Sequence, residues 1–138
     1  MSYLDIEIIK DLKSTNTNFT TLSDSEYELI TNKINETIPF SVCNIAWSLL
    51  NDSIYIGATS SYASMTLLAD TIKSITASDV IILGDSIDSA YLININNIAQ
   101  ALRIFSTIPQ HTYITQQNLK WIAGMSFESD IYFSTLQT

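Results

Sequence analysis

Cysteine, histidine and glycine are scarce in this chain, and each shortage excludes a class of chemistry. The 138 residues include one cysteine, Cys43, which excludes an internal disulfide and therefore a disulfide-stapled secreted scaffold. The one histidine, His111, lies far from Cys43 in sequence, so the pair supplies no clustered ligand set for zinc. The three glycines, Gly57, Gly84 and Gly124, are too widely spaced for a phosphate-binding or dinucleotide-binding loop. We expect no metal and no cofactor.

Positive charge is also scarce. Six Lys and Arg residues stand against fourteen Asp and Glu residues, giving a formal net charge of -8, and no basic cluster occurs. Nucleic-acid binding depends on Lys and Arg that neutralise phosphates, so we expect no nucleic-acid partner. The net negative charge favours binding of a basic protein, but a role in solubility alone would also explain it.

Long apolar runs and a secretion signal are absent. No apolar run approaches the about 18 residues of a membrane span. The opening "MSYLDIEIIK" carries Asp5 and Glu7 where a signal peptide would need a positive and then an unbroken apolar region. With 46% hydrophobic and 14% charged residues, the chain can bury a core. We expect one cytoplasmic globular domain over residues 1–138, with no membrane partner.

The first half of the chain predicts a strand, a loop, a helix and a hairpin. Alternation of Leu4, Ile6 and Ile8 with acidic residues predicts a strand in "YLDIEIIKDL", with a short amphipathic helix as the alternative. The polar run "KSTNTNFTT" predicts a loop. Ser23 and Glu26 have capping-box spacing, which predicts a helix start, and Pro39 follows the helix end.

The segment "SVCNIAWSLLNDSIYIGAT" predicts an antiparallel hairpin. Cys43, Ile45, Trp47 and Leu49 alternate onto one face, and Asn51-Asp52 offers the turn. A helix over residues 42–50 is the competing interpretation.

The second half predicts helices between strands. Apolar residues spaced by three and four in "SYASMTLLADTIKSIT" predict a helix, and "DVIILGD" predicts a strand buried on both faces. "AYLININ" predicts a strand, followed by a helix that Asn97 caps and Pro109 stops. Its expected inner face is Ile98, Ala101, Leu102 and Phe105. The tail predicts a short strand and then a hairpin around residues 128–130. The fold class is therefore α+β, with a mixed, largely antiparallel sheet and about three helices.

Five acidic residues are candidates for a functional surface. Asp85 and Asp88 follow the predicted buried strand, where sites collect in open sheets, and two carboxylates there could share a proton or a divalent ion. Glu128 and Asp130 lie at the last predicted turn, and Asp52 lies at the first. Aspartates are also ordinary turn and capping residues, so a solvated loop explains these acids better than a catalytic or metal site does.

A nucleophilic site made of Cys43 and His111 would require the fold to join two distant strands. The alternation places Cys43 on the apolar face with Ile45 and Trp47, where a free cysteine acts as a small packing residue. His111 is then expected to brace a turn, and we expect no catalytic residue and no enzymatic activity.

Several aromatic residues allow two interpretations. At strand spacing they usually pack in the core, but tyrosine and tryptophan are also enriched where proteins bind proteins. The aromatic candidates for contact with a partner are Tyr91, Tyr113, Trp121 and Tyr132.

Residues 78–133 carry a family resemblance. "SDVIILGD", then a helix, then "PQHTYI", "LKWIAGMSF" and "DIYF" place a tryptophan-bearing strand before an acidic, aromatic hairpin. In this arrangement, in size and in acidity, the chain resembles the small immunity proteins of bacterial polymorphic toxin systems, including contact-dependent growth inhibition. The resemblance implies a stoichiometric inhibitor that covers the active site of a cognate toxin domain, commonly a nuclease.

Two other functions stay open. One is a small hydrolase or transferase that uses Asp85 and Asp88. The other is a structural or adaptor protein that works as a homo-oligomer.

Overall fold

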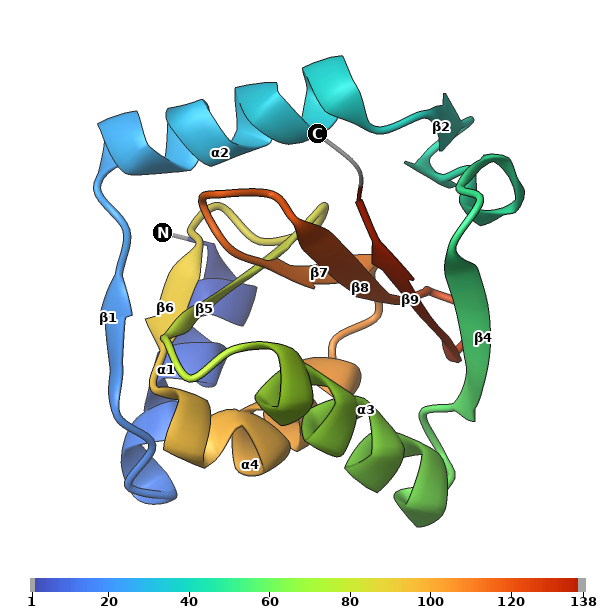
Figure 1. The fold of residues 1–138 in the computed structure, drawn as a ribbon. Coiled ribbons are helices and arrows are strands. Elements are labelled where there is room, and N and C mark those ends of the chain that lie inside the picture. The colour runs from blue at the N-terminus through green and yellow to red at the C-terminus, as the bar shows by residue number, and fades with distance from the viewer. Residues whose placement is uncertain (1, 137–138) are drawn as a thin grey trace.

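Helices cover both faces of one β-sheet in the computed structural model, which describes residues 2–136 (Figure 1). Helix α2 lies on one face, and α1, α3 and α4 lie on the other (Figure 1). The α-helices are α1 (Tyr3–Ser14), α2 (Asp24–Thr37), α3 (Tyr62–Ile75) and α4 (Ile98–Ser106). None of the helices formed by residues 2–136 is both long and apolar enough to cross a lipid bilayer.

The main sheet has seven strands in the order β1-β6-β5-β7-β8-β9-β4, and β2 and β3 form a separate hairpin. The strands are β1 (Phe19–Thr21), β2 (Phe40–Ser41), β3 (Asn44–Ile45), β4 (Ser53–Ala58), β5 (Val80–Gly84), β6 (Tyr91–Ile93), β7 (Thr112–Thr115), β8 (Trp121–Met125) and β9 (Asp130–Thr135). Each of these pairings is antiparallel. The predicted α+β class is confirmed.

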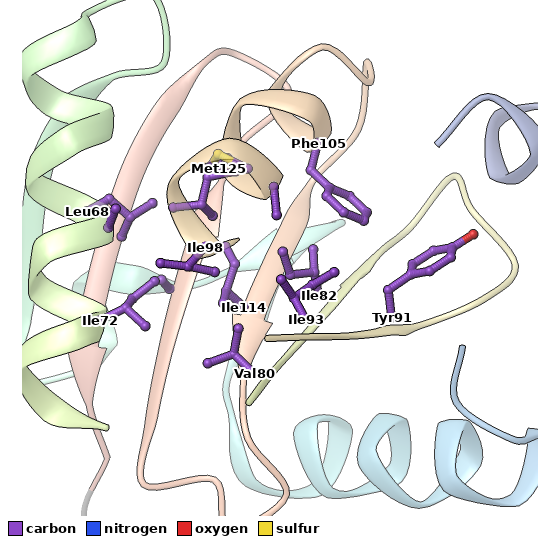
Figure 2. Close-up of a cluster of buried hydrophobic side chains, with 14 of the residues drawn as sticks. Leu68, Ile72, Val80, Ile82, Tyr91, Ile93, Ile98, Phe105, Ile114 and Met125 are labelled. Carbon is purple, nitrogen blue, oxygen red and sulfur yellow. The ribbon is translucent and has the colours of Figure 1, made fainter. Parts of the chain in front are cut away.

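A large core fills the space between the sheet and helices α1, α3 and α4. Leu68 and Ile72 of α3 lie opposite side chains of the sheet, and Phe105 of α4 lies near Tyr91 (Figure 2). The rings of Phe105 and Tyr91 are 5.6 Å apart between centroids. The predicted inner face of α4 is confirmed, because its four residues are fully buried.

A second core lies between the sheet and α2. Ile30 and Ile34 of α2 pack with Ile81 and Leu83 of β5, whereas Val80 and Ile82 of β5 face the first core. Alternate residues of β5 therefore supply both cores, which explains its unbroken apolar sequence. The predicted strand buried on both faces is confirmed.

The predicted strand in "YLDIEIIKDL" is wrong, and its helical alternative forms as α1. Ser2 caps this helix by accepting the Asp5 N–H at 3.1 Å, and the Asp5 side chain accepts the Ser2 N–H in return. Ile8 and Leu12 are spaced by four and fully buried, while Ile6 is exposed. The capping box and the four-residue spacing outweigh the two-residue alternation.

The other helix starts follow the sequence more closely. Ser23 caps α2 and forms the predicted capping box with Glu26. Helix α3 starts after Ser61, within the predicted segment. Asn97 precedes α4, but its side chain accepts the Asn18 N–H at 2.9 Å instead of capping the helix. The Asn97 side chain therefore ties the start of α4 to the segment before β1.

The predicted hairpin across Asn51-Asp52 is wrong. Only Asn44–Ile45 forms a strand before a single 3-10 turn, Trp47–Leu49, so the competing helix over residues 42–50 does not form either. Strand β4 pairs with β9 at an edge of the sheet. The 3-10 turn forms because Trp47 packs against β8, where Gly124 leaves room for the indole.

We expect Gly124→Ala to destabilise the fold by about 1–3 kcal/mol, the usual cost of overpacking a core. A Cβ at this position would lie 2.5 Å from Cζ2 of Trp47. Urea denaturation measures the change in the free energy of unfolding. In a Trp47→Leu background the same substitution should cost much less, since the two residues touch. An equal cost in both backgrounds would show that Trp47 is not the cause.

Candidate functional site

Loops from distant parts of the chain meet at one end of the main sheet. In the strand registers, Gly84 lies opposite Thr112, Thr112 opposite Met125, and Met125 opposite Ile131. The segment after β5, the segment before β7 and the β8–β9 turn therefore share this end. We call it the acidic end, after the carboxylates of Asp85, Glu128 and Asp130.

Asp85 is held in place by the strand next to it. Its N–H donates to the carbonyl of His111 at 3.2 Å, and its carboxylate accepts the His111 N–H at 3.0 Å. The side chain remains exposed. The carboxylate is thus held by a backbone hydrogen bond while it faces solvent, so little side-chain entropy would be lost on binding a cation.

The β8–β9 turn carries Glu128 and Asp130. Ser129 adopts a φ of 72°, and the Asp130 N–H donates to Oγ of Ser126 at 3.0 Å, so the turn is tight. The Tyr55 hydroxyl donates to the Asp130 carboxylate at 3.1 Å, and this hydrogen bond raises the pKa of Tyr55. Glu128 is exposed, and the Phe127 ring beside it is 61% exposed.

The fold places Cys43, in the β2–β3 hairpin, next to His111, which directly precedes β7. Cys43 is exposed, so the prediction that it packs on an apolar face is wrong. Its Sγ lies 3.7 Å from Nε2 of His111, and Nδ1 of the same ring accepts the Phe127 N–H at 3.1 Å. The neutral ring therefore carries its proton on Nε2. In this tautomer His111 donates to the sulfur and does not take the thiol proton. The ring therefore links the β2–β3 hairpin, through Cys43, to the β8–β9 turn, through Phe127.

Three adjoining hollows open along the acidic end. A groove of about 660 Å³ has Glu128, Asp130 and Tyr55 among its lining residues. A hollow of about 260 Å³ is lined in part by Glu128, Asp85 and Cys43. A pocket of about 200 Å³ under the β2–β3 hairpin is also lined by Asp85 and Cys43. Because neighbouring hollows share residues, they form one uneven surface.

The carboxylates of this surface are not neutralised within the described part of the chain. Lys33 donates to the carbonyl of Gln117 at 2.9 Å, and Arg103 lies 5.1 Å from the ring centroid of Tyr62. Among residues 2–136, no carboxylate accepts a hydrogen bond from a lysine or arginine. The acidic end therefore presents uncompensated negative charge.

The two other predicted acids are not among the lining residues of the three hollows along the acidic end. Asp88 is exposed in the segment after β5, but its backbone N–H is bound to the carboxylate of Asp5 at 2.8 Å. No hydrogen bond between residues 2–136 joins its side chain to Asp85. Asp52 precedes Ser53, which pairs with Ser134 at the opposite end of β9 from Asp130. The structure therefore gathers Asp85, Glu128 and Asp130 and separates Asp52 from them.

Three of the four predicted aromatic contacts are buried, which corrects their assignment to a binding surface. Tyr91 is 0% exposed, Tyr113 7% and Trp121 3%. Tyr91 donates to Asp5, Tyr113 donates to Asn44 at 2.8 Å, and Trp121 donates to Gln116 at 2.9 Å. Their polar atoms are satisfied inside the protein, so these rings support the fold, and Tyr113 also lines the pocket under the β2–β3 hairpin.

The exposed apolar residues are different ones. Tyr132 is half-buried, stacked on Trp47 at 5.2 Å between ring centroids. Val42, at the tip of the β2–β3 hairpin, and Phe127 are largely exposed beside the acidic end. Neither residue was predicted from the sequence to be exposed at a binding surface. Phe127 directly precedes Glu128 in the predicted turn, which is a signal for exposure, whereas the location of Val42 depends on the three-dimensional fold.

The chain matches no protein-family model, and no curated protein matches its sequence. Within residues 2–136, no three His, Cys, Asp or Glu side chains are grouped so that they could hold a metal ion.

Proposed function

We propose that this protein is an immunity protein that binds a basic, nuclease-type toxin domain through the acidic end and covers the active site of that domain. The observation that carries the proposal is the gathering of Asp85, Glu128 and Asp130 on one hollowed surface, with no lysine or arginine of residues 2–136 bound to them. Phe127 and Val42 supply exposed apolar area beside these charges.

This combination suits a protein partner whose own surface is cationic. A nuclease attracts phosphates with positive charge, and fixed carboxylates compete for the same surface. Complementary potentials accelerate encounter and determine orientation, and apolar side chains at the centre of an interface supply affinity. Binding should therefore weaken as the salt concentration rises.

Co-expression tests the proposal. The probe is a basic, toxin-like domain encoded by a neighbouring reading frame, produced in cells with or without this protein. We expect growth to be restored only when this protein is present, and we expect a 1:1 complex by size-exclusion chromatography with light scattering. Unrelated toxins serve as the control. Continued toxicity, with no complex at low salt, would exclude this neutralising function.

A further inference from the structure

The pocket under the β2–β3 hairpin has aromatic and aliphatic walls. Helix α2 contributes Tyr27 and Ile34, the hairpin contributes Phe40, and the sheet contributes Leu83 and Tyr113. The rings of Phe40 and Tyr113 meet edge to face, 6.2 Å apart between centroids. At about 200 Å³ the pocket is smaller than the about 300–1,000 Å³ of sites for drug-sized ligands. It has room for one side chain of a partner.

The polar groups of this pocket favour a cation. The fixed carboxylate of Asp85 lines the pocket, and no lysine, arginine or histidine lies among its lining residues. Donors on an incoming group would meet unused acceptor capacity at the Asp85 carboxylate.

Burial and nearby carboxylates raise the pKa of both phenols of the pocket, Tyr113 and Tyr27. Burial is the larger cause that raises the pKa of Tyr113, and the nearby charge of Asp85 raises it further. Burial also raises the pKa of Tyr27, to which the charges of Asp88 and Asp5 add. The pocket thus combines low polarity with a negative field, which is the environment in which a desolvated cation–aromatic contact is strongest.

We propose that this pocket binds one arginine side chain of the toxin domain. The aliphatic stem packs on Ile34 and Leu83, and the guanidinium stacks on the aromatic wall and pairs with Asp85. Arginine fits better than lysine because its planar, weakly hydrated head stacks on rings and binds a carboxylate through two parallel hydrogen bonds. This inference rests on the proposed function and names the residue type by which the partner is anchored.

Titration of the isolated protein with blocked arginine tests the pocket without any toxin. The probe is Nα-acetyl-arginine methylamide, followed by NMR shifts of the amides around Tyr113 and Asp85. We expect saturable binding in about the millimolar range. The citrulline analogue has the same shape without the charge, and it should bind at least about tenfold more weakly. Equal binding of the two probes, or no saturable shift with arginine, would overturn the inference.

Variants locate the binding site. Asp85→Asn retains the oxygen that accepts the His111 N–H and should weaken arginine binding about tenfold, while Phe40→Leu removes the exposed ring and should weaken it about two- to fivefold. Asp52→Asn is the matched control and should change nothing, because Asp52 precedes β4 at the end of the sheet opposite Asp130. Equal losses in Asp52→Asn and Asp85→Asn would show only nonspecific charge attraction and would reject the pocket.

The two proposals fail in different ways. If blocked arginine does not bind but the whole protein still neutralises a toxin through Glu128 and Asp130, only the pocket is rejected. If arginine binds and no toxin is neutralised, the pocket remains and the immunity function is rejected.

Discussion

Association with a cationic toxin domain is expected to slow at least about tenfold at low salt when Asp85→Asn, Glu128→Gln and Asp130→Asn are combined, because charge complementarity steers encounter. The amides are nearly isosteric and can still accept the bonds from the His111 N–H and the Tyr55 hydroxyl. The fold should therefore persist. Stopped-flow measurements at two or more salt concentrations give the association rate and its salt dependence.

A matched variant removes the same number of charges elsewhere. Asp11→Asn, Asp52→Asn and Asp70→Asn change exposed acids of α1, the β4 approach and α3. We expect this control to keep most of the wild-type rate at salt concentrations where the Debye length is about 8–10 Å. If both triple variants slowed association equally, net charge rather than the acidic end would attract the partner.

Asp5→Ala is expected to destabilise the protein by about 3 kcal/mol or more, because several buried donors lose their acceptor together. The Asp5 carboxylate is fully buried. It accepts hydrogen bonds from Ser2 at the start of α1, from the N–H groups of Asp88 and Ser89, and from the Tyr91 hydroxyl. This one side chain therefore caps a helix and anchors the segment after β5. Urea denaturation measures the loss.

The contribution of Asp5 to the free energy of unfolding should depend on pH. Burial alone would raise its pKa, but the hydrogen bonds from Ser2, Tyr91 and the backbone of Asp88 and Ser89 outweigh burial and lower the pKa. A lowered folded-state pKa stabilises the protein above the unfolded value of about 3.9, and this stabilisation is lost as the pH falls through the folded-state pKa. The difference in stability between wild type and Asp5→Ala should shrink in that acidic range. A difference independent of pH would contradict the assigned network.

The parts of the fold that depend on neighbouring residues could be predicted from the sequence. Ser23 and Glu26 define the start of α2 through bonds within one turn. The continuous apolar run of β5 predicts burial on both faces because no polar side chain interrupts it. The β8–β9 hairpin and the exposure of Glu128 follow in the same way from alternation and turn composition.

The predictions that were wrong failed because local patterns competed or because long-range packing decided the structure. Ser2 and Asp5 have the same capping spacing as Ser23 and Glu26, but two-residue alternation in the same segment pointed to a strand. Trp47 alternates with its neighbours yet forms a 3-10 turn because it packs on β8. The contact between Cys43 and His111 joins positions 68 apart, so no local pattern could reveal it.

The strand order also determines when the main sheet can finish folding as the chain is synthesised. Strand β4 leaves the ribosome early, but its partner in the main sheet is β9, and Tyr55 donates a hydrogen bond to Asp130, 75 positions later. Such non-local pairing delays folding, since a long stretch of chain must be ordered before the contact forms. The large groove therefore comes into existence only after nearly the whole described chain has been translated. Nascent chains would therefore lack the proposed binding surface, which would form only when synthesis of the chain is nearly complete.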